Sequence, residues 1–91
     1  MPYSLEITPT YTKRLIKFLK KHQDLKERYY KVITLLEADP YHPSLRLHKL
    51  SGKLNMLHSV SLNMQYRITM EFTIVEGKIT PVNIGTHEEV Y

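Results

Sequence analysis

Tyr66-Arg67-Ile68-Thr69-Met70-Glu71-Phe72-Thr73-Ile74-Val75 is the stretch that decides the fold. It is dense in β-branched and aromatic residues, which favour a strand. Asn63-Met64 precedes it and Glu76-Gly77 follows it, and both pairs are typical of turns. Beyond these turns lie two further strand candidates, Met56–Leu62 and Lys78–Ile84. The pattern therefore predicts three consecutive antiparallel strands.

Two amphipathic helices are predicted before these strands. Thr8-Pro9 is typical of a helix start, because threonine caps the first turn and proline suits the first helical position. We expect this helix to end near His22-Gln23. Asp24 with Glu27 resembles a capping box for the second helix, which Asp39-Pro40 would end. The apolar residues at helical spacing, expected in the core, are Tyr11, Leu15, Phe18, Leu19, Leu25, Tyr29, Val32, Ile33 and Leu36.

The order of these elements predicts an α+β fold. Residues 3–7 alternate apolar and polar side chains, as a half-buried strand does. The chain then reads as a strand, an antiparallel helical hairpin and three antiparallel strands that form a small sheet with the helices packed on one face. Residues 1–91 fit a single domain. The other face of the sheet would stay partly open, and polar chemistry is expected at the loops and strand ends that border it.

The composition excludes some classes of site. The sequence has no cysteine, so disulfides and thiolate metal sites are excluded. No pair of histidines has the close helical spacing usual for zinc ligands, and we expect neither a metal nor another cofactor. Because no signal peptide or membrane-length apolar run is present, we expect a cytoplasmic protein that does not contact a membrane.

Positive charge is distributed unevenly along the chain. The formal net charge is +4, and Pro40–Met70 contains no acidic residue. The cations of that segment are Arg46, Lys49, Lys53 and Arg67. A basic surface favours a polyanion through counterion release. The lysines of the helices are interpreted as a solvated face, whereas the acid-free segment places its cations in turns and strands beside histidines, which favours binding of a polyanion.

Two distant segments each supply part of a candidate site. Leu47–Lys53 precedes a predicted strand, and Gly85–Tyr91 follows the last one. RNA carries its own nucleophile, the 2′-hydroxyl, so its cleavage needs a base, an acid and cations around the phosphate. His48 and His87 are the acid–base candidates, with their roles left open. Arg67 would clamp the phosphate with its planar guanidinium, and Tyr91 could stack on a base or assist proton transfer.

Structural roles are open for the same residues. His87 could be a frayed terminal histidine without a role, and His48 a loop histidine that contacts the backbone. Arg67 could form a cross-strand ion pair with Glu71 or Glu76. Lys49 and Lys53 are expected to make general electrostatic contacts rather than to act in catalysis.

The chain resembles the RelE/ParE superfamily of toxin–antitoxin toxins over nearly its whole length. The motifs that carry the resemblance are Leu47-His48-Lys49-Leu50-Ser51-Gly52-Lys53-Leu54, Tyr66-Arg67-Ile68 and Gly85-Thr86-His87-Glu88-Glu89-Val90-Tyr91. The terminus is most similar to the YafQ-type branch, in which histidines at the places of His48 and His87 are taken as catalytic. The resemblance implies a ribosome-dependent endoribonuclease, an mRNA interferase that cleaves in the ribosomal A site by internal 2′-hydroxyl attack, requires no metal and is neutralised by a cognate antitoxin.

The resemblance also assigns residues, and the sequence departs from the YafQ pattern at some of them. Tyr66-Arg67 and Tyr91 are similar to RelE, whose arginine is assigned to the scissile phosphate. The residues expected to bind RNA are Arg46, Lys49, Lys53, Ser61 and Gln65. Ser61 stands where YafQ-type toxins have histidine, Gln65 where they have aspartate, and Asn83 where they have arginine. The site is therefore a hybrid.

Two other functions stay open at this stage. One is a ParE-like inhibitor that binds DNA gyrase and cuts nothing, against which the Gly-Thr-His terminus argues. The other is a degenerate toxin that retains only antitoxin or RNA binding. In either toxin case an antitoxin with an acidic, partly disordered segment is the expected partner. For the nuclease, ribosomal RNA is expected to contact the basic helices.

Overall fold

The computed structural model describes residues 3–73 and 76–91. The strands are β1 (Ser4–Leu5), β2 (His48–Lys49), β3 (Leu57–Ser61), β4 (Tyr66–Thr73) and β5 (Lys78–Thr86), and the α-helices are α1 (Pro9–Lys21), α2 (Lys26–Ala38) and α3 (His87–Val90). Short 3₁₀ turns lie at Gln23–Leu25, Pro43–Leu45 and Gly52–Leu54.

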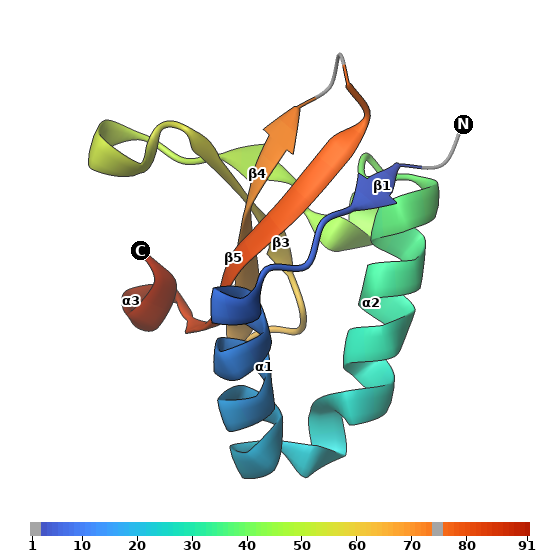
Figure 1. Ribbon diagram of the computed structural model, residues 1–91, viewed down its shortest axis with the longest axis vertical. Coiled ribbons are helices and arrows are strands. Elements are labelled where there is room, and N and C mark those ends of the chain that lie inside the picture. The colour runs from blue at the N-terminus through green and yellow to red at the C-terminus, as the bar shows by residue number, and fades with distance from the viewer. Residues whose placement is uncertain (1–2, 74–75) are drawn as a thin grey trace.

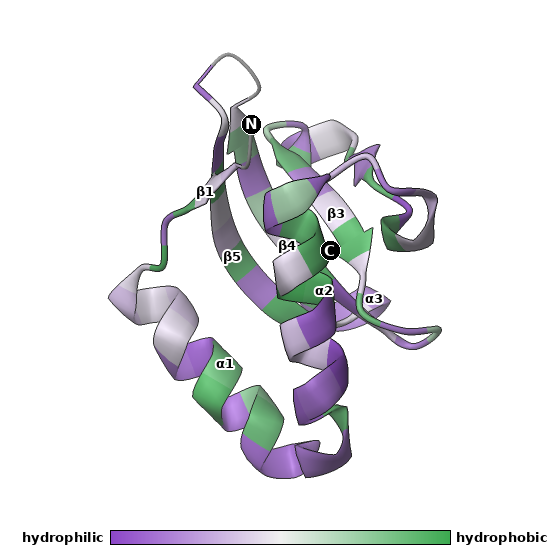
Figure 2. Cartoon of the chain, turned by 90° about the vertical axis from the view of Figure 1, so that its right-hand side faces the viewer, coloured by the Kyte–Doolittle hydropathy of each residue, from purple (hydrophilic) through white to green (hydrophobic). Residues whose placement is uncertain are grey.

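A five-stranded mixed sheet with the order β1-β5-β4-β3-β2 forms the centre of the fold. β1 pairs with β5 in parallel, and every other pairing is antiparallel. The helices α1 and α2 form an antiparallel hairpin beside the sheet, and α3 lies on the opposite side of the sheet from α2 (Figures 1 and 2). None of the helices in the described ranges is long and apolar enough to cross a membrane.

The predicted α+β fold is confirmed, as are the start and end of the first helix. The Tyr11 N–H donates to Thr8 Oγ1 at 3.1 Å, and His22 caps the other end. The capping box predicted for the second helix is wrong. The chain makes a 3₁₀ turn through Asp24, and the helix begins only at Lys26, so Glu27 stands at the second helical position rather than the third.

Two short elements were absent from the prediction. β2 lies inside the segment expected to be a loop, and α3 follows directly on β5. The last strand also runs two residues beyond Ile84, to Thr86. Ile74 and Val75, predicted to extend β4, lie outside the described residues.

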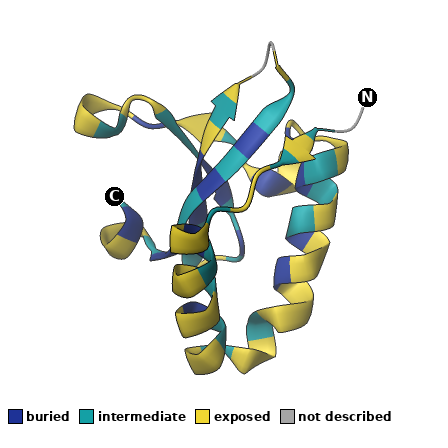
Figure 3. Cartoon of the chain, in the orientation of Figure 1, coloured by how far each residue is buried: buried dark blue, intermediate teal, exposed yellow. Residues whose placement is uncertain are grey.

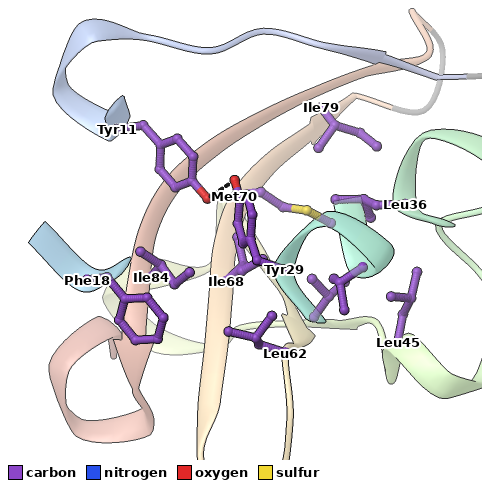
Figure 4. Packing of buried hydrophobic residues seen from close by; sticks show 12 residues of the cluster. Tyr11, Phe18, Tyr29, Leu36, Leu45, Leu62, Ile68, Met70, Ile79 and Ile84 are labelled. Atoms are coloured by element: carbon purple, nitrogen blue, oxygen red, sulfur yellow. Dashed lines mark hydrogen bonds between the residues drawn. The ribbon is translucent and has the colours of Figure 1, made fainter. Parts of the chain in front are cut away.

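Alternation along β4 divides the sheet into two faces. Ile68 and Met70 are fully buried and point toward the helical hairpin, where they meet Tyr11 and Tyr29 (Figure 4). Figure 3 shows exposed residues along α1 and α2 and buried ones within the central strands. The other face of β4 therefore carries Arg67, next to Ile68 on the strand.

A bulge changes the alternation of β5. Thr69 pairs with Asn83 and Met70 pairs with Pro81, which leaves Val82 as the extra residue. The Val82 carbonyl accepts a hydrogen bond of 2.7 Å from Arg14 Nη1 of α1. The inward position therefore changes from odd to even residue numbers at this bulge, so that both Ile79 and Ile84 are buried in the core.

The buried hydroxyls of Tyr11 and Tyr29 hydrogen-bond to each other at 2.9 Å, which joins α1 to α2. Tyr11→Phe is expected to lower the free energy of unfolding by about 1–3 kcal/mol, because the Tyr29 hydroxyl loses its partner. Urea denaturation of both single variants and the Tyr11→Phe/Tyr29→Phe double variant tests this. The double variant should lose less free energy of unfolding than the two single variants lose together. Strictly additive losses would contradict the hydrogen bond between the two hydroxyls.

Candidate functional site

The structure brings His48, His87 and Tyr91 together. Tyr91 Oη lies 3.2 Å from His48 Nε2, and the ring centroids of His87 and Tyr91 are 4.0 Å apart. Both histidines are exposed, and Tyr91 is half-buried. These three side chains border a hollow of about 430 Å³ that also receives Lys49 and Lys53. We call it the β2–α3 hollow.

The surroundings of His48 fix which ring nitrogen carries its proton. Nδ1 lies 3.2 Å from the carbonyl oxygen of Arg46. A carbonyl can only accept, so Nδ1 must be the donor in this contact. In the neutral ring Nε2 is then the acceptor, and the Tyr91 hydroxyl donates to it. A proton-accepting nitrogen therefore faces the β2–α3 hollow.

Arg46 adopts a strained backbone conformation directly before β2. Its φ of +50° lies in the left-handed region. Among the described residues other than glycine, Arg46 alone has a positive φ. Such a conformation costs about 1–2 kcal/mol for an L-residue and often accompanies functional sites. Here it ends the 3₁₀ turn at Leu45 and directs the Arg46 carbonyl at His48.

A capping box fixes the start of α3. Thr86 Oγ1 accepts from the Glu89 N–H at 3.2 Å, and Glu89 Oε1 accepts from the Thr86 N–H at 2.8 Å. The Glu89 side chain lies over Gly85, where an added Cβ would come within 3.0 Å of Glu89 Oε1. Glycine at position 85 thus lets the carboxylate reach the backbone, and the box sets the direction in which His87 and Tyr91 project.

The hydrogen bond from the Thr86 N–H to the Glu89 carboxylate lowers the pKa of Glu89 most, the Thr86 side chain lowers it further, and so do the nearby Lys21 and His22 at the end of α1. The carboxylate is therefore the form that the structure favours. Its contribution to α3 is present above the ordinary glutamate pKa and is lost as the pH falls through the lower value of the folded state.

Arg67 lies on the same face of the sheet as His48 but in a different hydrogen-bonded group. Its Nη1 donates to Ser61 Oγ of β3 at 3.2 Å, and its backbone pairs with Ser61 and Gly85. His48 pairs with Ser59, two residues from Ser61, so both share a face by strand alternation. Arg67 is half-buried and does not line the β2–α3 hollow.

The ion pair considered for Arg67 is not observed. Within residues 3–73 and 76–91, neither Glu71 nor Glu76 contacts its guanidinium, and the ion pair present joins Lys78 to Glu6 at 3.2 Å. The Arg67 guanidinium is therefore free of a carboxylate partner among the described residues.

The remaining predicted residues fall into separate places. Gln65 borders a hollow with His87, whereas Ser61 and Arg46 border one beside α2. Asn83 faces a groove against α1, with its Oδ1 accepting from the Ile84 N–H at 2.9 Å. No group of three histidine or acidic side chains in the described ranges is placed to bind a metal ion.

Sequence reasoning missed the residues that position the site. Glu89 and Gly85 act through the capping box, whose Thr-x-x-Glu spacing was visible in the sequence. The role of the Arg46 carbonyl left no signal, because a positive φ at arginine cannot be inferred from its neighbours.

Solved structures with the same fold exist. YafQ in the E. coli DinJ–YafQ toxin–antitoxin complex has a TM-score of 0.77 and 16% identity, over 100% of this chain and 99% of that one. A metal-bound toxin from Helicobacter pylori has a TM-score of 0.76 and 24% identity, over 98% and 99%. A YoeB/ParE toxin from Agrobacterium tumefaciens has a TM-score of 0.72 and 12% identity, over 92% and 98%.

The chain has the RelE/ParE toxin fold. The resemblance predicted from the sequence is thereby confirmed at the level of the fold. No protein-family model matches the sequence, and no curated protein matches it at a significant level. In this RelE/ParE fold, the β2–α3 hollow lies where the second strand meets the carboxy-terminal helix.

Acid titration of the capping box is expected to loosen α3. As the pH falls from 7 to 3, the chemical shift of the Thr86 amide proton should decrease, because the Glu89 carboxylate that accepts its hydrogen bond becomes protonated. The midpoint of this change is expected below pH 4.5, since the pKa of Glu89 is lowered. Two-dimensional ¹H–¹⁵N spectra measure this, and Glu89→Gln, which keeps a neutral acceptor, serves as the control. A midpoint at or above 4.5 would count against the box.

Proposed function

We propose that this protein is the toxin of a type II toxin–antitoxin pair and a ribosome-dependent endoribonuclease that cleaves mRNA. The observation that supports this most is the cluster of His48, His87 and Tyr91 at the β2–α3 hollow. It places two imidazoles and a phenol beside Lys49 and Lys53, on a fold shared with YafQ.

The proposed reaction is internal attack by the 2′-hydroxyl of the RNA. His48 Nε2 takes the 2′-hydroxyl proton, and the 2′-oxygen forms a bond to phosphorus. The bond from phosphorus to the 5′-oxygen breaks, and the leaving oxygen receives a proton from protonated His87. The products are a 2′,3′-cyclic phosphate and a 5′-hydroxyl.

The acceptor state of His48 Nε2 supports its role as the base. In the free protein this nitrogen accepts from the Tyr91 hydroxyl. The 2′-hydroxyl of bound RNA would replace Tyr91 as the donor, which frees the phenol to stack on a base or to donate to the phosphate. Lys49 and Lys53, which line the same hollow, would supply the positive charge around the phosphate.

The proposed protein partner is a cognate antitoxin. YafQ, which shares the fold, was solved in a toxin–antitoxin complex with DinJ. The acid-free segment that contains β2 and β3 presents Lys49 and Lys53 at the β2–α3 hollow, and an acidic, partly disordered segment could fold across it. In this proposal the antitoxin blocks the groups that would otherwise contact RNA, and the protein acts in the cytoplasm on mRNA in the ribosomal A site.

A second candidate is a ParE-like protein that inhibits DNA gyrase without cutting RNA. It is favoured by the residues Ser61, Gln65 and Asn83, which leave the YafQ pattern incomplete, and by the fold shared with a YoeB/ParE toxin. A gyrase supercoiling assay with the purified protein separates the two functions, because only the ParE-like protein would inhibit it.

His48→Ala and His87→Ala are each expected to reduce mRNA cleavage by about 10²- to 10⁴-fold, because each removes a proton-transfer group. Primer extension on an mRNA translated in a purified system measures the cleavage. Thr73→Ala, at the exposed end of β4, is the control and should cleave like the wild type. Equal cleavage by the wild type and the His87 variant would remove His87 from the mechanism.

A further inference from the structure

A second hollow adjoins the β2–α3 hollow at β2. It measures about 350 Å³ and runs along β2 and the loop before it, with Tyr41 and His58 among its walls. His48 and Lys49 border both this hollow and the β2–α3 hollow. The two hollows therefore adjoin each other at β2, and a ligand bound in one lies next to the other.

Tyr41 offers an open aromatic face in this hollow. Its side chain is 55% exposed, yet its ring lies 6.0 Å from that of Phe72, and its N–H donates to Asp39 Oδ1 at 3.0 Å. The His58 ring packs edge-on against the same Phe72, with the centroids 5.3 Å apart. Phe72 thus supports two rings, and the exposed one is free to stack on a planar ligand.

The charges around this hollow suit a polyanion. Arg46 and Lys49 are exposed cations in its lining, and none of the described residues that line it is acidic. Burial, followed by the charges of Lys49 and His48, lowers the pKa of His58, so this ring adds an uncharged aromatic surface near neutral pH. Exposed aromatic rings interleaved with cations are the features by which proteins bind single-stranded nucleic acids.

We infer that this second hollow binds the nucleotide adjacent to the scissile phosphodiester of a single-stranded RNA. Tyr41 stacks on its base, and Arg46 and Lys49 contact its phosphates. The inference rests on the proposed function, because it is the nuclease site at His48 that makes this nucleotide the neighbour of the bond that breaks. An apolar peptide is disfavoured by the two cations, and the flat Tyr41 ring favours a base over a simple anion.

The test measures binding without cleavage. The probe is a fluorescein-labelled oligoribonucleotide with 2′-O-methyl groups throughout, which has no nucleophile, and the readout is fluorescence anisotropy at low salt. Tyr41→Ala should weaken binding by about 5- to 150-fold, the range expected for loss of one stacked base, whereas Tyr41→Phe keeps the ring and should bind within about twofold of the wild type.

Two further variants control the experiment. Tyr30→Ala removes a tyrosine of nearly equal exposure, 56%, from α2 and should bind like the wild type. Tyr41→Leu keeps apolar packing on Phe72 but has no flat face, so it should weaken binding even if Tyr41→Ala does not fold. Circular dichroism melting confirms that each variant is folded.

The outcomes separate this inference from the proposed function. Wild-type affinity in the folded Tyr41→Ala or Tyr41→Leu variant would overturn the subsite, as would no binding of the probe by the wild type. Neither result concerns cleavage, which the translated mRNA assay measures. Conversely, Tyr41-dependent binding by a wild type that cuts no translated mRNA would support the subsite for RNA and contradict the nuclease.

Discussion

The hydrogen bond between Tyr91 and His48 is the interaction on which the candidate site depends. It joins residues 43 positions apart in the sequence, one on an edge strand of two residues and one at the carboxy-terminal end of the described chain. Without it, the two histidines would belong to separate surface segments. With it, an acceptor nitrogen, a phenol and a second imidazole surround one hollow lined with lysine side chains.

Several local features combine to allow this contact. The β5 bulge at Val82 changes which side chains of that strand face the core, and Arg14 Nη1 donates to the Val82 carbonyl. Gly85 leaves room for the Glu89 carboxylate, which caps α3. On the other side, the left-handed backbone of Arg46 orients His48. Strain and close packing are therefore concentrated on both sides of the site, as is common where side chains must be positioned.

The sequence was most informative where an element is long and its pattern periodic. The Thr8 cap, the amphipathic helices and the strand from Tyr66 were predictable, because burial of one face requires a regular spacing of apolar residues. β2 and α3 were not, since elements of two and four residues are too short to show a period. The likeness of motifs correctly indicated the RelE/ParE fold.

For the site, the sequence identified the two segments that meet but not how they meet. The contact joins Tyr91 at the end of α3 to His48 in β2, and a strand of two residues has no sequence signature. Arg67 illustrates the limit. The sequence offered Glu71 and Glu76 as partners for its guanidinium, but the strand register pairs Arg67 with Ser61, and its hydrogen bond goes to the Ser61 hydroxyl.

The most direct test of this account is the state of the His48 ring in solution. Long-range ¹H–¹⁵N spectra at about pH 8.5, well above the ordinary histidine pKa, distinguish the two tautomers and can be combined with nuclear Overhauser effects. The account predicts that Nδ1 carries the proton and that the rings of His48 and Tyr91 show mutual Overhauser effects. A proton on Nε2 with no Overhauser effect between the two rings would contradict it.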